Sequence, residues 1–203
     1  MCELVFFQEA VLATNRQKIL NIKRMKAIAI ICPGIHSPYL TESFIENIQN
    51  TNIIDSKDYL VLPTEQYAPY SAIAIERWLK QCYPSPKDAP AISFISFSAG
   101  VVGSIGAAIA WQLQGGRINS FIAFDGWGMP LLGNFPLYRV SHDLFTHYSS
   151  AVLGGGERGF YADPQVEHLE IWRSPNTCWG WQSIGSGLKT RCLLTEYLQN
   201  ILT

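Results

Sequence analysis

The chain has 203 residues, of which 48% are hydrophobic and 15% charged, and its formal net charge is −1. This balance excludes a disordered chain, and the scattered Lys and Arg residues exclude a nucleic-acid-binding surface. The length suits one folded domain with a sizeable core. The five cysteines lack CxxC spacing and the four histidines lack an HxxxH or HExxH array. We therefore expect reduced cysteines, a cytoplasmic location and no metal site.

The first part of the chain differs from the rest. Residues 1–24 have an acidic residue at position 3 and no basic start, which argues against a signal peptide. No apolar run is long enough to span a membrane. We interpret residues 1–24 as an N-terminal extension, either an added helix or an upstream start-site extension. Residues 25–203 are then expected to form a single domain.

After Met25, apolar segments that predict strands alternate with segments that predict helices. Strands are expected over 26–34, 58–63, 91–98, 120–126, 137–143 and 166–172, and helices over 41–50, 69–83, 99–116 and 187–202. Thr41 is expected to cap its helix and Pro69 to lie in the first turn of its own. Strands this apolar are buried on both faces, which predicts an α/β fold with three αβα layers and a mostly parallel sheet.

Ser98 stands between a buried strand and a long helix, in the stretch Ser96-Phe97-Ser98-Ala99-Gly100. A serine at such a sharp turn exposes its hydroxyl, and its neighbours must be small because strand and helix approach closely. Ser96 and Gly100 meet this requirement. The start of the helix favours negative charge, and the Ala99 N–H is a candidate oxyanion donor.

This stretch resembles the nucleophile elbow of the α/β-hydrolase superfamily, G-x-S-x-G, with serine in place of the first glycine. The resemblance extends over the strand and helix order of residues 26–202. It implies that Ser98 is a nucleophile. It also implies that the loop after the first strand supplies the second oxyanion donor, from Ile35 or His36.

The resemblance further implies a carboxylate just after a late strand. Asp143, followed by Leu144, Phe145 and Thr146, is our first choice. Asp125 is the second choice, because some members of the superfamily carry the acid one strand earlier. The alternative for Asp125 is a turn residue before Gly126.

The general base is harder to assign. The superfamily places its histidine after the last strand, yet the stretch that follows 166–172 contains none. His168 falls inside that expected strand and is interpreted as structural. His147 is our choice of base, with His142 as an alternative. His36 is interpreted as a substrate contact or a turn residue.

Only ten residues separate the strands expected at 120–126 and 137–143, too few for a helical lid. Trp127, Met129 and Leu131 in this connection are interpreted as the lining of an open acyl-binding groove, or alternatively as a packed loop. The glycine-rich residues 153–159 are expected to form a flexible loop.

These features predict a serine hydrolase that acts on a small ester or thioester without a cofactor or a nucleic-acid partner. One alternative is a binding or scaffold protein with the same fold, suggested by the missing histidine. A less favoured alternative is a dinucleotide-binding oxidoreductase, because residues 98–103 approach a G-x-G-x-x-G pattern and Asp125 ends the next strand. The sequence does not identify the substrate, distinguish hydrolysis from acyl transfer or give the oligomeric state.

Overall fold

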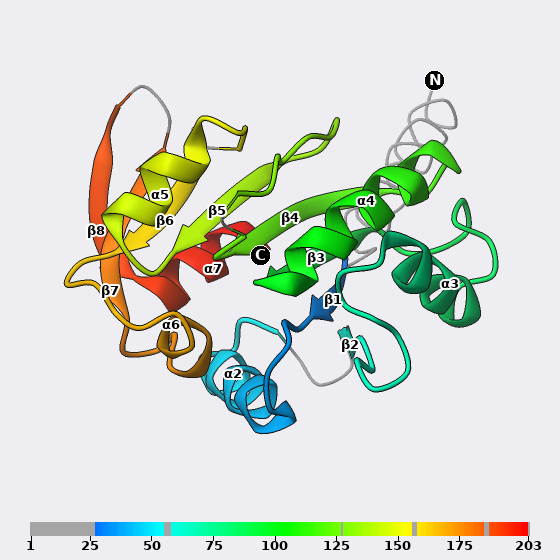
Figure 1. Ribbon diagram of the computed structural model, residues 1–203, viewed down its shortest axis with the longest axis horizontal. Coiled ribbons are helices and arrows are strands. Elements are labelled where there is room, and N and C mark those ends of the chain that lie inside the picture. Colours follow the sequence, from blue (N-terminus) through cyan, green and yellow to red (C-terminus); the bar gives the residue numbers. More distant parts are fainter. Residues whose placement is uncertain (1–26, 55–57, 127, 156–157, 185–186, 203) are drawn as a thin grey trace, which may run out of the picture.

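A computed structural model describes residues 27–54, 58–126, 128–155, 158–184 and 187–202 (Figure 1). The expectation for residues 1–24 and the role of Trp127 lie outside the described residues. Within them, eight strands form one sheet in the order β2-β1-β3-β4-β5-β6-β7-β8. Strands β1 to β6 are parallel to one another, whereas β7 and β8 join antiparallel. The expected α/β class with a mostly parallel sheet is therefore confirmed.

The element bounds show where the chain enters and leaves the sheet. The strands are β1 (Ile28–Cys32), β2 (Tyr59–Val61), β3 (Ile92–Phe97), β4 (Ile118–Phe124), β5 (Leu137–Ser141), β6 (Arg158–Ala162), β7 (Trp179–Ile184) and β8 (Lys189–Leu193). The helices are α2 (Pro38–Asn50), α3 (Ala72–Cys82), α4 (Ala99–Leu113), α5 (Leu144–Ala151), α6 (Glu170–Arg173) and α7 (Leu194–Leu202).

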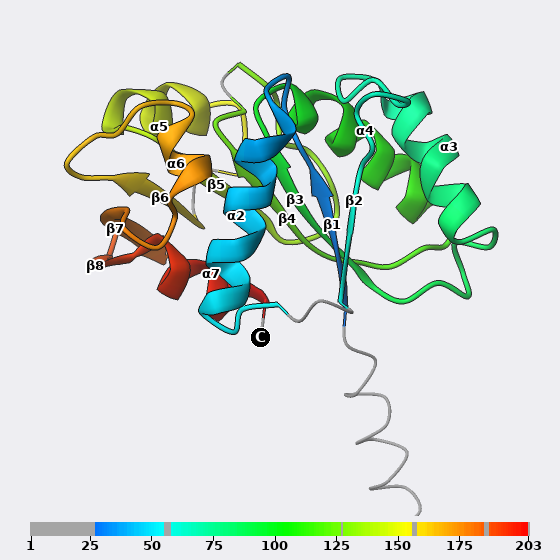
Figure 2. The ribbon, with the colours of Figure 1, turned by 90° about the horizontal axis from the view of Figure 1, so that it is seen from below.

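Helices cover both faces of the sheet (Figures 1 and 2). Alternate strand residues point to opposite faces, so Ile95 and Phe97 pack with α2, α6 and α7 while Phe94 packs with α3 and α4. Helix α5 lies on the α3 and α4 face, where its His147 ring contacts Tyr161. No helix in the described parts of the chain is long and apolar enough to cross a membrane.

Two helix starts differ from the sequence prediction. Helix α2 begins at Pro38 after Ser37, so Thr41 lies inside the helix and is not its cap. Proline suits this position because its fixed φ is already helical and its missing N–H has no helical partner. Helix α3 begins at Ala72, and the Ser71 hydroxyl accepts a hydrogen bond from the Ala74 N–H, so Pro69 precedes the helix.

The prediction of a strand over 166–172 is wrong. Both edges of β6 are already paired, with β5 and with β7, so the parallel part of the sheet has no place for another strand here. The segment instead forms a turn and the short helix α6, which buries Ile171 and Trp172. The Trp172 ring stacks between Phe44 and Phe97, at centroid distances of 3.8 and 5.0 Å.

The C-terminal third also contains strands that the sequence analysis missed. Strand β6 begins at Arg158, so the expected flexible loop over 153–159 ends inside the sheet. The helix expected over 187–202 begins only at Leu194, because residues 189–193 form the edge strand β8. Lys189, Thr190 and Arg191 are exposed there, as charged residues commonly are on an edge strand.

Candidate active site

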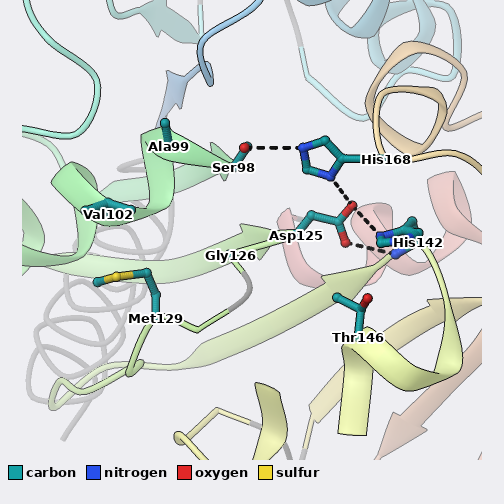
Figure 3. A pocket seen from close by; sticks show the side chains of 9 residues that line it. All are labelled: Ser98, Ala99, Val102, Asp125, Gly126, Met129, His142, Thr146 and His168. Atoms are coloured by element: carbon teal, nitrogen blue, oxygen red, sulfur yellow. Dashed lines mark hydrogen bonds and ion pairs between the residues drawn. The ribbon is translucent and has the colours of Figure 1, made fainter. Parts of the chain in front are cut away.

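Ser98 occupies a strained turn between β3 and α4. Its φ is 51° and its ψ −118°, a left-handed backbone that a non-glycine residue rarely adopts. The Ser98 N–H donates to the Phe124 carbonyl of β4, at 2.9 Å, and this bond holds the turn against the neighbouring strand. The sharp turn directs the hydroxyl into a pocket at the carboxyl edge of the sheet (Figure 3).

The small neighbours of Ser98 have clear packing reasons. A Cβ on Gly100 would lie 2.2 Å from the Cys32 carbonyl oxygen, so only glycine lets α4 approach the end of β1 this closely. The Ser96 side chain is buried two residues before Ser98, and its hydroxyl accepts a hydrogen bond from Ser104 at 2.7 Å. The serine is therefore accommodated by a partner on the first turns of α4.

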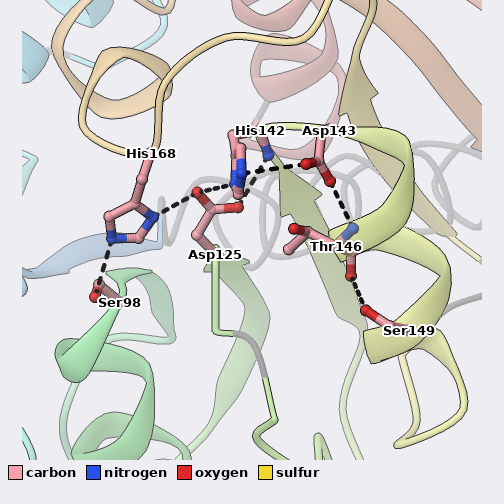
Figure 4. A network of polar contacts seen from close by, with 7 residues as sticks. All are labelled: Ser98, Asp125, His142, Asp143, Thr146, Ser149 and His168. Carbon is pink, nitrogen blue, oxygen red and sulfur yellow. Dashed lines mark hydrogen bonds and ion pairs between the residues drawn. The ribbon is translucent and has the colours of Figure 1, made fainter.

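His168 links Ser98 to a buried carboxylate. The His168 Nε2 lies 3.3 Å from the Ser98 Oγ, and its Nδ1 lies 2.8 Å from the Asp125 Oδ2 (Figure 4). An ionised carboxylate can only accept, so Nδ1 carries the proton and Nε2 is free to accept from the serine hydroxyl. A bond of 3.3 Å is long, but such bonds commonly shorten when substrate binds.

The loop that carries His168 is fixed at several points. It follows β6, the last parallel strand, and the Val166 N–H donates to the His142 carbonyl at 3.0 Å. The His168 ring also stacks on Phe97, the residue before Ser98, with a centroid distance of 4.8 Å. The ring is thus oriented by an aromatic face and by Asp125 together. The strand misassigned at 166–172 explains why the sequence analysis took His168 as structural.

Asp125 follows β4 in another left-handed turn, with φ 47°. Its side chain is 1% exposed. The Oδ1 accepts a hydrogen bond from the backbone N–H of His142 at 2.9 Å. The Oδ2 lies 2.9 Å from the Nδ1 of His142 and 2.8 Å from the Nδ1 of His168. Burial opposes ionisation, but the hydrogen bonds from His142 and His168 outweigh it and lower the pKa of Asp125. The carboxylate is therefore charged and oriented toward both imidazoles.

His142 lies between two carboxylates. Its Nδ1 is 2.9 Å from the Asp125 Oδ2, and its Nε2 is 3.3 Å from the Asp143 Oδ2. The hydrogen bond with Asp125 raises the pKa of His142, and the charges of Asp125, Asp143 and Glu167 add to this effect against partial burial. His142, the alternative base in the sequence analysis, thus contacts Asp125, whereas His168 is the imidazole that contacts Ser98.

The structure does not bring Asp143 and His147 together with Ser98. The Asp143 carboxylate caps α5, where its Oδ1 accepts from the Thr146 N–H at 2.6 Å. His147 is 3% exposed and packs against Tyr161, and its Nδ1 has no hydrogen-bond partner among the described residues. Burial, with the charges of Lys189 and Arg139, lowers the pKa of His147 to about 4.

Of the expected oxyanion donors, Ala99 lines the pocket over Ser98. Ala99 is the first residue of α4, and the first N–H groups of a helix have no partner within it. In the loop after β1, a Cβ on Gly34 would lie 3.0 Å from the Ser98 Cβ, so Ile35 and His36 follow a glycine that lies close to Ser98. The His36 ring packs against Phe97, and its Nδ1 lies 2.9 Å from the Ser37 carbonyl oxygen.

A pocket of about 410 Å³ opens over Ser98. Its lining residues are Ser98, Ala99, Val102, Asp125, Gly126, Met129, His142, Thr146 and His168. Met129 thus lines the pocket, as expected. Leu131 is buried in the core beside α4 and does not line it, in line with the packed-loop alternative.

Asp125, His142 and His168 also offer one ligand atom each within 4.8 Å of one another, a set that could hold a metal ion. The nitrogen-to-oxygen distances of 2.8 and 2.9 Å are, however, those of hydrogen bonds. Ligands bound about 2.0–2.2 Å from a tetrahedral zinc lie roughly 3.3–3.6 Å apart. Metal binding would require these groups to move apart and both Nδ1 protons to leave, so the arrangement fits a proton-transfer network better.

A scan of the chain against models of protein families found no match, and a search of curated proteins found none either. The geometry of the site is therefore the basis on which its function is inferred.

Proposed function

We propose that this protein is a serine hydrolase of the α/β-hydrolase type, with Ser98 as nucleophile, His168 as general base and Asp125 as the orienting acid. The observation that carries the proposal is the position of His168, with one ring nitrogen at the Ser98 hydroxyl and the other at the buried Asp125 carboxylate. This is the relation of nucleophile, base and orienting group that acyl transfer requires.

Two further observations support the assignment to this superfamily. Ser98 follows β3, Asp125 follows β4 and His168 follows β6, so all three lie at the carboxyl edge of the parallel strands. The left-handed backbone of Ser98 also matches the nucleophile elbow. The acid comes from the earlier strand, which was the second choice in the sequence analysis.

The reaction follows from this geometry. The Ser98 Oγ attacks the substrate carbonyl carbon while its proton moves to the His168 Nε2. Asp125 stabilises the resulting imidazolium, and the N–H of Ala99 with one from the Ile35–His36 loop stabilises the oxyanion. The imidazolium then protonates the leaving alcohol or thiol, which leaves an acyl ester on Ser98. A water molecule, deprotonated by His168, releases the acid and restores Ser98.

The two alternatives have less support. The scaffold hypothesis depended on the missing histidine, and the contact of His168 with the Ser98 hydroxyl argues against it. A dinucleotide-binding protein would need a free carboxylate at the end of β4, whereas Asp125 is held by His142 and His168.

Labelling with a fluorophosphonate probe tests the proposal, because such probes react with activated serines. We expect the wild-type protein to be labelled and Ser98→Ala to lose labelling completely. Ser96→Ala is the matched control, because Ser96 lies two residues earlier on β3, is buried and is hydrogen-bonded to Ser104 instead of His168. A folded wild-type protein that remains unlabelled, or label retained in Ser98→Ala, would contradict the assignment.

A further inference from the structure

The pocket over Ser98 has a polar side and an apolar side. His168, Asp125 and His142 form the polar side, whereas Val102 and Met129 lie together away from them (Figure 3). Val102 projects from α4 one turn beyond Ser98 and is 39% exposed. A substrate carbonyl held at Ser98 would therefore direct one of its substituents along an aliphatic wall.

The lining of the pocket contains a carboxylate but no lysine or arginine among the described residues. This buried, ionised group is the Asp125 carboxylate. The Asp143 and Glu167 carboxylates are close enough to act on His142. Arg139 is 2% exposed, and it donates to the carbonyl oxygens of Gly154 and Met129. Its guanidinium supports the Met129 segment and does not line the site.

Large apolar side chains are also exposed next to the site residues in the chain. Ile35 and Phe145 are each 74% exposed and Leu169 is 39% exposed. In the sequence, Ile35 follows Gly34, whose backbone lies close to Ser98. Phe145 precedes the pocket residue Thr146, and Leu169 follows His168.

We propose that the site is specific for esters with a neutral, aliphatic acyl chain, which lies along Val102 and Met129, and that it discriminates against acyl chains that end in a carboxylate. This inference rests on the proposed hydrolase function. The aliphatic wall favours a chain of methylene groups, whereas a terminal carboxylate there would lose water without gaining a cationic partner. The Asp125, Asp143 and Glu167 charges would repel it further.

Two esters of equal acyl length test this inference: p-nitrophenyl hexanoate and the mono-p-nitrophenyl ester of adipic acid. We expect kcat/KM to be at least about tenfold higher for the hexanoate, with the ratio shrinking at high salt, because salt screens the repulsion. Equal values, or a preference for the adipate ester, would overturn the inference while leaving the hydrolase proposal intact. Failure to hydrolyse either ester in a Ser98-dependent way would overturn both.

Met129→Lys provides a gain of function. A cation on the apolar wall should raise kcat/KM for the adipate ester and reduce the ratio at least several-fold, whereas the uncharged control Met129→Gln should weaken hexanoate hydrolysis without helping the adipate ester. Val102→Lys repeats the test from the exposed face of α4 and covers the case in which Met129→Lys does not fold. A ratio unchanged in both folded lysine variants would contradict the proposed position of the acyl chain.

Discussion

Helix α5 and the loop over 163–169 each carry a histidine, and the two side chains have opposite environments. His147 on α5 is 3% exposed and its Nδ1 has no partner among the described residues. The His168 side chain is 42% exposed, and both of its nitrogens have polar partners. The difference favours His168 as the proposed general base, because its ring is oriented and still reaches the pocket, whereas His147 is close to an acid in the sequence but buried away from Ser98.

The largest expected effect separates these two histidines directly. His168→Ala removes the proposed base and should lower kcat/KM roughly 10²- to 10⁴-fold. His147→Leu keeps a buried apolar side chain in place and should leave kcat/KM near the wild-type value. Ester hydrolysis by both purified variants measures this. Loss of activity in a folded His147→Leu, with activity kept in His168→Ala, would reverse the assignment.

The two candidate carboxylates allow a similar comparison. Asp125→Asn removes the charge that stabilises the imidazolium, and kcat should fall roughly 10²- to 10⁴-fold. Asp143→Asn removes the same charge at the start of α5, but the asparagine oxygen can still cap the helix, so kcat and thermal stability should change little. Kinetics combined with thermal unfolding distinguish the two, and similar losses in both variants would contradict the separate roles.

A smaller effect concerns acid stability. Since the pKa of His147 is lowered from 6.5 to about 4, the unfolded chain binds a proton below pH 6.5 that the native protein does not take up. Stability therefore falls as the pH drops from 6.5 toward 4. In urea unfolding, we expect His147→Leu to reduce the loss between pH 7 and pH 5 by about 2 kcal/mol.

His142 provides the control of opposite sign within the same experiment. Its pKa is raised, so its contribution to stability is complete below pH 6.5 and is lost as the pH rises through the folded pKa. His142→Asn should lower the free energy of unfolding relative to wild type, and this loss should be larger at pH 5 than at pH 8. The difference between the two losses is about 0.2–1 kcal/mol after solvent screening. The same pH dependence for the His142 and His147 variants would contradict the environments described.

Much of the N-terminal two-thirds of the fold could be predicted from the sequence, because its strands are continuous apolar runs between clear helical patterns. Strand β3 is likewise a continuous apolar run and α4 has a helical pattern. Ser98 and its small neighbours indicate the turn between them. In the C-terminal third, β6 begins within a glycine-rich run and β8 has exposed Lys189, Thr190 and Arg191. These segments form strands because they pair with residues that are distant in the sequence, and the local pattern of residues does not reveal such pairing.

The sequence by itself determined the sheet class, the turn at Ser98 and a short set of candidate acids and histidines. Only the tertiary structure decided that His168 and Asp125, and not His147 and Asp143, meet at that turn. The reason is physical: strands β3, β4 and β6 bring to one edge three residues that lie 27 and 43 positions apart in the chain. Which ring reaches the serine then depends on the end of β6, on the Phe97 face and on the buried carboxylate together.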